Sequence, residues 1–161
     1  DAKIASSQLR ELVFSINPDF DHFDDMQAYF QEHARLYLED SGIQLYFNLP
    51  KSNSHTLIHP DIKRQLLLLF KEVLNNILKH ANAQQVWIQL EELDTKSYLL
   101  EIKDDGKGFD PKLAGKSSNG MRGLIQRTES ISATLKITSK LGTGTTIRVI
   151  GPLQFGNGHS A

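Results

Sequence analysis

Apolar residues recur along this chain at two spacings, and each spacing predicts one kind of element. Apolar positions three and four residues apart mark one face of a helix, whereas strict alternation marks a strand with one buried face. Helical spacing predicts helices at about 23–38, 61–80 and 119–132, and a weaker one at about 5–16. Alternation predicts strands at about 43–49, 86–91, 98–104, 135–140 and 145–150.

The order of these elements favours an α+β fold, a two-layer α/β sandwich with helices on one face of a mixed sheet. Charged side chains indicate that the other face of the sheet is solvated, namely those of Glu91, Glu92, Glu101 and Lys103. A chain of 161 residues is expected to form one main domain, which we place at 19–153. The segment 154–161 contains glycine and is expected to be a flexible tail.

Composition narrows the function classes. The net charge is −1 and there is no basic run, so the electrostatics do not suggest a nucleic-acid partner. The absence of cysteine excludes disulfides and cysteine metal sites. No apolar stretch approaches the length of a membrane span, so we expect this piece not to insert into a membrane. The chain begins at Asp1 and not at methionine, which is typical of a piece of a longer protein.

Three polar residues interrupt the apolar pattern of the helix at 61–80. Glu72, Asn76 and Lys79 are spaced four and three residues apart, so they lie on one face of that helix. A metal-phosphate site needs such a stripe of polar groups. A solvated helix face explains the same pattern, and this helix alone does not decide between them.

A carboxylate stands at the end of the strand at 98–104. Alternation places Asp104 on the same face as Leu100 and Ile102, toward the core. A buried carboxylate needs a donor, and the amino group of a purine ring is one candidate. Gly106 and Gly108 would let the backbone turn and approach a ligand closely. An ordinary Asp-Gly turn is the alternative.

Two further glycine segments follow. The segment from Asn119 to Leu124 opens a predicted helix, where free backbone amides favour an anion, although an ordinary glycine-containing helix start fits equally well. The turn at 140–146 joins two predicted strands, and a plain hairpin explains its glycines as well. Thr145 has the parity of Ile147 and Val149, so its hydroxyl is expected to point inward.

Other nucleotide and metal motifs fail. Gly115-Lys116-Ser117 resembles the end of a phosphate loop, but Asp110 occupies the position that requires the earlier glycine. We interpret this segment as a flexible lid. No dinucleotide-binding glycine fingerprint occurs, and the Asp104-Asp105 pair lacks the alternating oxygen ligands of a calcium loop.

Taken in order, these four segments resemble the motifs of one family. They match the N box (Glu72, Asn76, Lys79, His80 and Ala81) and three glycine boxes (Asp104, Gly106, Gly108 and Phe109; Gly120, Gly123 and Leu124; Gly142, Gly144 and Thr145). The resemblance is to the ATP-binding catalytic domain of two-component sensor histidine kinases, which has the Bergerat fold. It covers about 57–152 and is strongest to the short-lid NarX/DesK-like subfamily.

The resemblance implies a site for ATP and Mg²⁺. Asp104 would accept a hydrogen bond from the adenine amino group, with Thr145 assisting through water, while Gly106, Gly108 and Phe109 would shape the adenine pocket. Asn76 would bind the magnesium ion. The phosphates would be covered by the segment that comprises Gly120, Met121, Arg122, Gly123 and Leu124.

The resemblance also implies catalytic residues near the phosphate tail. Lys79 and His80 would lie beside it, and Glu72 would support the metal, orient the acceptor histidine or activate water. The domain would present the γ-phosphate to a phosphoacceptor histidine for later transfer to a response regulator. None of His22, His33, His55, His59 and His159 is followed by the acidic residue usual after that acceptor.

This fragment is therefore expected to bind ATP without phosphorylating itself. Residues 1–18 would be the tail of the dimerisation hairpin that carries the acceptor, or a linker. The domain would be cytoplasmic, whether or not the parent protein is anchored in a membrane.

Three alternatives would explain the same motifs, and the first two share the pocket. Gyrase B, MutL and the heat-shock chaperone ATPases use a glutamate at the position of Glu72 to activate water. The anti-sigma-factor kinases transfer phosphate to a serine of another protein. A degenerate domain that only docks a partner is the third alternative, against which the intact Asp104, Asn76 and glycines argue.

Overall fold

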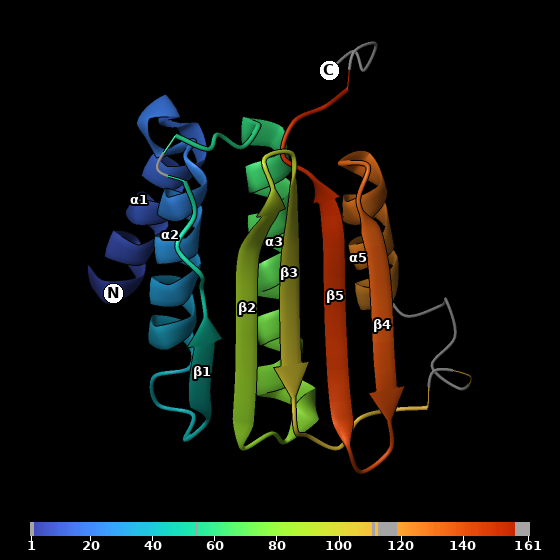
Figure 1. The fold of residues 1–161 in the computed structure, drawn as a ribbon. Coiled ribbons are helices and arrows are strands. Elements are labelled where there is room, and N and C mark those ends of the chain that lie inside the picture. Colours follow the sequence, from blue (N-terminus) through green and yellow to red (C-terminus); the bar gives the residue numbers. More distant parts are fainter. Residues whose placement is uncertain (1, 54, 111, 113–118, 157–161) are drawn as a thin grey trace.

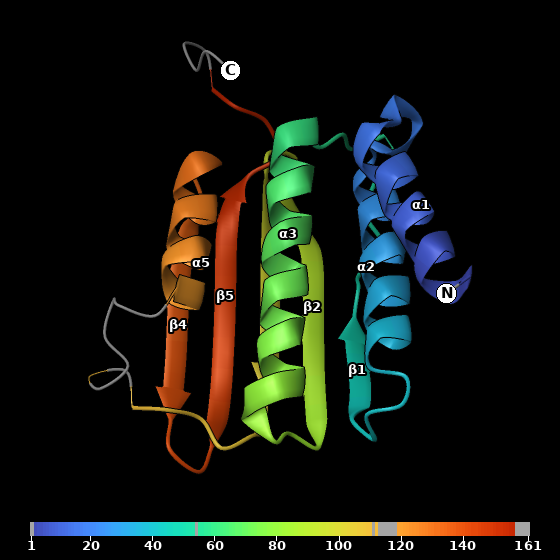
Figure 2. The same cartoon turned by 180° about the vertical axis from the view of Figure 1, so that it is seen from behind.

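One mixed sheet, covered by helices on a single face, forms the protein in a computed structural model that describes residues 2–53, 55–110, 112 and 119–156 (Figures 1 and 2). The helices are α1 (Ala2–Ile16), α2 (Phe23–Tyr37), α3 (Pro60–Asn76) and α5 (Asn119–Ser130), with the short helical turns η1 (Pro18–Phe20) and η2 (Ile77–Ala81). The strands are β1 (Gln44–Asn48), β2 (Gln85–Asp94), β3 (Ser97–Asp104), β4 (Thr134–Lys140) and β5 (Gly144–Pro152).

The sheet has the order β1-β2-β3-β5-β4. Strand β1 runs parallel to β2, and the other neighbours are antiparallel, so the sheet is mixed as predicted. In the β3–β5 ladder Asp104 pairs with Thr145, which brings two of the predicted motifs together at one end of the sheet. The predicted α+β two-layer sandwich is confirmed, and every predicted element is present with ends shifted by a few residues.

Helix α3 lies across the middle of the sheet and supplies much of the core (Figure 2). Its apolar side is fully buried, including Leu66, Leu69 and Phe70. The predicted helix at 61–80 is wrong in its last turn. The α-helix ends at Asn76 and continues as the π-helical turn η2, after which Asn82 adopts a left-handed conformation with φ 52°. Such wider turns re-aim side chains and are frequent at functional sites.

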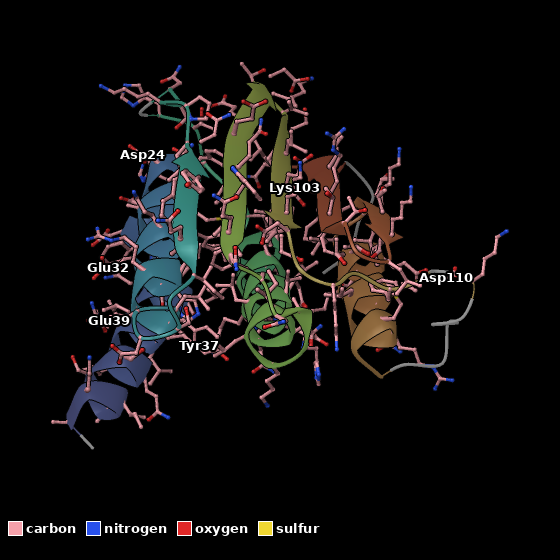
Figure 3. All side chains as sticks on the ribbon, turned by 90° about the horizontal axis from the view of Figure 1, so that it is seen from below. Asp24, Glu32, Tyr37, Glu39, Lys103 and Asp110 are labelled. Atoms are coloured by element: carbon pink, nitrogen blue, oxygen red, sulfur yellow. The ribbon has the colours of Figure 1, made fainter. Side chains whose placement is uncertain are left out.

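The second face of the sheet is open. Figure 3, viewed along the strands, shows Lys103 on the side of the sheet away from α3. Its ammonium group lies 5.4 Å from the ring centroid of Trp87, and Arg148 pairs with Glu101 on neighbouring strands of this face. The solvated face is therefore observed for Glu101 and Lys103, but the prediction is wrong for Glu92, which pairs with the buried Tyr98 and accepts a hydrogen bond from the Thr56 hydroxyl.

Helix α1 lies on the outer side of α2 (Figure 2). Phe14 is its one buried residue, and its ring stacks on that of Tyr29 at 4.1 Å between centroids. The buried ammonium group of Lys63 donates to the carbonyl oxygens of Phe14 and Phe20 and to a carboxylate oxygen of Asp21. One lysine of α3 therefore ties the end of α1 and the turn η1 to the core.

The last described residues lie beside the first turn of α3. The ring of Phe155 packs edge-on against that of His59, with centroids 4.7 Å apart, so the second residue of the segment predicted to be a tail is packed. The rest of that segment, 157–161, and the predicted lid at 115–117 lie outside the described residues. Within the described chain, no helix combines the length and the apolar character that a bilayer crossing requires.

The aromatic contacts of α2 yield a first prediction, on the pH dependence of stability. His33 stacks with Tyr29 and Tyr37, and burial lowers its pKa from 6.5 to about 4, with a smaller effect from Lys71 in the same direction. Between these pH values the unfolded chain binds a proton that the folded chain does not. The stability present above pH 6.5 is therefore expected to fall by about 3 kcal/mol as the pH drops toward 4.

Urea unfolding at several pH values measures this loss. The variant His33→Phe keeps an aromatic ring in the stack and is expected to remove most of the pH dependence in this range. The same substitution at the exposed His55 is the matched control and should leave the slope unchanged. An unaltered slope in His33→Phe would contradict the assignment.

Candidate functional site

A cavity of about 400 Å³ lies between α3, η2, α5 and the ends of β3, β4 and β5. Its volume is in the range of small-molecule sites. Apolar side chains form most of the wall, including Val73, Ile77, Ile102, Leu124, Ile137 and Ile147. The polar lining residues are Asn76, His80, Asp104, Lys107 and Thr145. A mostly apolar wall with a few polar groups suits a flat heterocycle that carries a charged tail.

Asp104 is the buried carboxylate of this cavity. Asp104 is only 5% exposed to solvent, which agrees with the inward direction predicted from alternation. Burial raises the pKa of this carboxyl, while hydrogen bonds from the backbone N–H groups of Gly106 and Thr145 lower it. The Gly106 bond is 2.8 Å long. The carboxylate is thus held rigidly and retains acceptor capacity toward the cavity.

The neighbouring Asp105 has a different task. One of its carboxylate oxygens accepts from the backbone N–H groups of Gln84 and Gln85, at 2.8 and 2.9 Å. These bonds fix the start of β2 against the end of β3. The two aspartates that adjoin in sequence therefore separate into a cavity residue and a residue that closes a strand end.

The glycines of this end pack against backbone. A Cβ atom on Gly106 would overlap the carbonyl of Ala81, one on Gly108 the carbonyl of Lys140, and one on Gly144 the carbonyl of Asp104. Gly108 and Gly144 also have positive φ values of 62° and 112°. These close contacts with the chain's own carbonyl groups build the cavity wall, and Gly108 also lines the cavity, so the approach of a ligand to these glycines stays a prediction.

Ser139 is a polar residue that sequence reasoning missed. Its hydroxyl accepts from the backbone N–H of Phe109 at 2.9 Å and lies 2.8 Å from the hydroxyl of Thr145. Ser139 pairs with Thr145 in the β4–β5 ladder. The predicted hairpin already implies this register. The position of Ser139 opposite Thr145 could therefore have indicated it from the sequence.

The residues of the N box do not all lie in the cavity. Asn76 and His80 line the cavity, whereas Glu72 and Lys79 are not among its lining residues. Lys79 is exposed. The carboxylate of Glu72 faces α5, where one oxygen lies 3.7 Å from the Nε atom of Arg127. Lys107 also lines the cavity, but the sequence analysis missed it. Only its position between two glycines pointed to it.

The second glycine box is helical from its start. Gly120 lies in the first turn of α5. Met121 and Leu124 line the cavity, and Arg122 is exposed. Gly123 lies over Glu72: a Cβ atom there would be 3.2 Å from both carboxylate oxygens.

The donors fit a magnesium ion that is carried by phosphates. Among the residues that the structure describes there is no group of three or more histidine or acidic side chains that could hold a metal by itself. Mg²⁺ usually takes one or two protein oxygens and completes its shell with phosphate and water. The amide oxygen of Asn76, on the cavity wall, is a ligand of that kind.

Comparison with known proteins identifies the class. The sequence profile described as histidine kinase-, DNA gyrase B- and HSP90-like ATPase matches residues 61–154. The chain belongs to this family, and it therefore contains an ATP-binding domain. The membership predicted from the four motifs is confirmed.

Particular relatives lie on the kinase branch. The chain is 32% identical over 117 residues to the signal transduction histidine-protein kinase/phosphatase DegS of Bacillus subtilis, which covers 70% of this chain and 30% of the relative. It is 33% identical over 124 residues to DegS of Brevibacillus brevis, covering 77% and 30%. The chain thus spans about 30% of the length of these relatives.

Solved structures share the fold. A histidine kinase domain of the blue-light activated histidine kinase of Erythrobacter litoralis has a TM-score of 0.63 at 23% identity, over 80% of this chain and 61% of that one. The Acinetobacter baumannii histidine kinase AdeS has a TM-score of 0.65 at 12% identity, over 96% and 79%. At these identities the likeness concerns the fold alone.

Proposed function

We propose that this chain is the catalytic ATP-binding domain of a DegS-like sensor histidine kinase. It binds ATP with Mg²⁺ and presents the γ-phosphate to a phosphoacceptor histidine on another segment of the same protein. The observation that carries the proposal is the rigid, buried carboxylate of Asp104 in an apolar cavity that Asn76 and His80 also line.

Asp104 would select adenine. The carboxylate accepts hydrogen bonds and donates none, so it matches the exocyclic amino group of adenine and repels the carbonyl of guanine. Two backbone N–H groups hold it in place, which lowers the ordering cost of recognition. Thr145 and Phe109 would complete the base pocket together with Gly106 and Gly108.

The phosphates would lie along the helical wall. Asn76 would supply an oxygen to a magnesium ion, which neutralises phosphate charge when bound. Lys79, His80 and Lys107 would add donors near the phosphate tail, and the start of α5 from Gly120 to Leu124 would cover it. Glu72 remains the residue for which metal, water and acceptor-orienting roles are all predicted.

The chemistry would be transfer of the γ-phosphoryl group. A nitrogen of the acceptor imidazole attacks phosphorus, the bond to the bridging β–γ oxygen breaks, and ADP leaves with the electron pair. Such transfer depends on positioning and charge neutralisation, and a domain without a nucleophile of its own can supply both. A response regulator would then receive the phosphoryl group in the cytoplasm, where ATP is available.

The outward face of helix α1 has the residue pattern of a helix that packs against another helix. Its outward residues Ala2, Ala5, Leu9, Leu12 and Ile16 repeat at alternating spacings of three and four, and all are exposed. The charged residues of α1 instead form ion pairs within the chain. Lys3 pairs with Glu39, which follows α2, Arg10 with Glu32 of α2, and Glu11 with Lys71 of α3. An uncharged stripe with heptad spacing is typical of a helix that packs on another helix. This pattern supports assigning residues 1–18 to the dimerisation hairpin or its linker.

One titration tests the function. ATP is added with and without magnesium while phosphate release is measured in the same sample. We expect binding that magnesium strengthens, with little turnover and no phosphohistidine on the fragment itself. Steady hydrolysis that Glu72→Gln abolishes would move the chain to the ATPase branch, and transfer to a serine of a partner would favour the anti-sigma-factor kinases. Absence of ATP binding would contradict the proposal.

A further inference from the structure

An ion pair between α3 and α5 lies beside the cavity, outside its lining. The Nε atom of Arg127 is 3.7 Å from a carboxylate oxygen of Glu72, and another guanidinium nitrogen donates to the side-chain oxygen of Gln65 at 3.1 Å. Gln65 and Glu72 are seven residues apart on α3, so they share one face. A single arginine of α5 thus spans two turns of α3.

The same face of α5 carries Gly123, four residues before Arg127. Its missing side chain leaves the space into which the Glu72 carboxylate fits, since a Cβ atom would lie 3.2 Å from each oxygen. The carboxylate therefore contacts α5 at two points one turn apart. The Glu72 side chain thus lies in the interface between α3 and α5.

The pair is only partly formed. Arg127 Nε is buried and has no hydrogen-bond partner among the described residues. A buried donor without an acceptor costs free energy, and the nearest acceptor is the Glu72 oxygen at 3.7 Å. An approach of about 0.8 Å would bring the two atoms to ordinary hydrogen-bond distance.

That approach would also narrow the cavity. Met121 and Leu124 of the same helix line the cavity on its α5 side, next to the residues that face α3. A bound nucleotide would give these two side chains an apolar surface to contact. Occupancy of the cavity and closure of the ion pair therefore favour the same displacement of α5.

We propose that Glu72 and Arg127 form a latch that positions α5 and closes when a nucleotide fills the cavity. Glu72 is then a positioning residue, which binds neither the metal nor the attacking water. The link to nucleotide rests on the proposed function, whereas the hold on α5 does not. A nucleotide shifts the equilibrium between the open and the closed latch only if it binds the closed state more tightly. Removing the latch must therefore lower the affinity for the nucleotide.

A double-mutant cycle tests the latch. Affinity for ATP and hydrogen exchange of the α5 amides are measured for the wild type, Glu72→Gln, Arg127→Met and the double variant. We expect each single variant to weaken ATP binding about 3- to 10-fold, with or without magnesium, and to speed exchange in α5. The double variant should be no weaker than the weaker-binding single variant.

The matched control is a carboxylate-arginine pair on the open face of the sheet. Glu101 and Arg148 are 2.6 Å apart there, and Glu101→Gln with Arg148→Met should change neither the affinity nor the exchange of α5. Independent, multiplying losses for the latch variants would overturn the proposal. So would a loss in Glu72→Gln that requires magnesium while Arg127→Met binds normally, because that pattern marks a metal ligand.

Gly123 provides a second route if Arg127→Met does not fold. Gly123→Ala should weaken ATP binding by pushing on the carboxylate, and Glu72→Ala, which removes that carboxylate, should suppress the effect. Equal losses in both backgrounds would overturn the latch. If the wild type binds no ATP, the proposed function fails, and hydrogen exchange of the α5 amides alone then tests the positioning role. Faster exchange in both single variants, with no further increase in the double variant, supports that role. Unchanged exchange refutes it.

Discussion

Asp104→Asn is expected to weaken ATP binding about 10- to 100-fold. The carboxylate accepts from the backbone N–H groups of Gly106 and Thr145, and in the proposed complex it would also accept from the adenine amino group. Asparagine keeps the shape but has a single acceptor oxygen. If that oxygen stays with the backbone, the amide NH₂ group faces the adenine amino group and repels it. Isothermal titration with ATP and with GTP measures the change.

The selectivity between bases is the sharper readout. An NH₂ group that faces the cavity can donate to the carbonyl of guanine, so the ratio of ATP to GTP affinity should fall more than the overall affinity. Asp105→Asn is the matched control. Its carbonyl oxygen can still accept from Gln84 and Gln85, and its side chain is absent from the cavity lining. Unchanged ATP affinity in Asp104→Asn would refute the assigned base pocket.

Lys63→Met is expected to lower the free energy of unfolding by about 2–4 kcal/mol. The ammonium group is fully buried, and it satisfies two carbonyl oxygens and the carboxylate of Asp21 at 2.8 Å. Methionine fills a similar volume, so the loss reports the unpaired acceptors and not a cavity. Urea unfolding followed by circular dichroism measures it, and α1 should lose protection from hydrogen exchange.

The same helix supplies the control for this experiment. Lys71 binds Glu11 at 2.8 Å, and so also joins α3 to α1, but its side chain is 35% exposed. Exposed pairs contribute at most about 1 kcal/mol, so Lys71→Met should cost much less than Lys63→Met. Equal losses in the two variants would show that the attachment of α1, and not burial of the charge, governs the stability.

Sequence patterns were sufficient for the fold because its elements are regular. The alternation in β3 places Leu100, Ile102 and Asp104 on the buried face, and the structure agrees. The π-helical turn at Ile77–Ala81 could not be predicted, since its apolar spacing is also compatible with one more turn of α-helix. What changes that turn is its packing: the N–H of Lys107 donates to the carbonyl of Ala81, and Gly106 packs against the same group.

The site shows the same division. Asn76, His80, Asp104 and Thr145 were named from their motifs and all line one cavity. Ser139 and Lys107 were missed because neither belongs to a motif, and their place depends on contacts between separate segments. Glu72 was named with the cavity residues, and its ion pair with Arg127 is visible only once α5 lies on α3.

The sequence by itself determined the elements, the inward carboxylate and the family, because each is encoded by local spacing of residue types. Only the tertiary structure decided what those residues contact. The glycines beside Asp104 meet carbonyl groups of distant segments, Lys63 meets the end of α1, and Glu72 meets α5. Contacts of this kind join positions that are tens of residues apart, so no local pattern records them, and they decide which polar groups are left to bind a ligand.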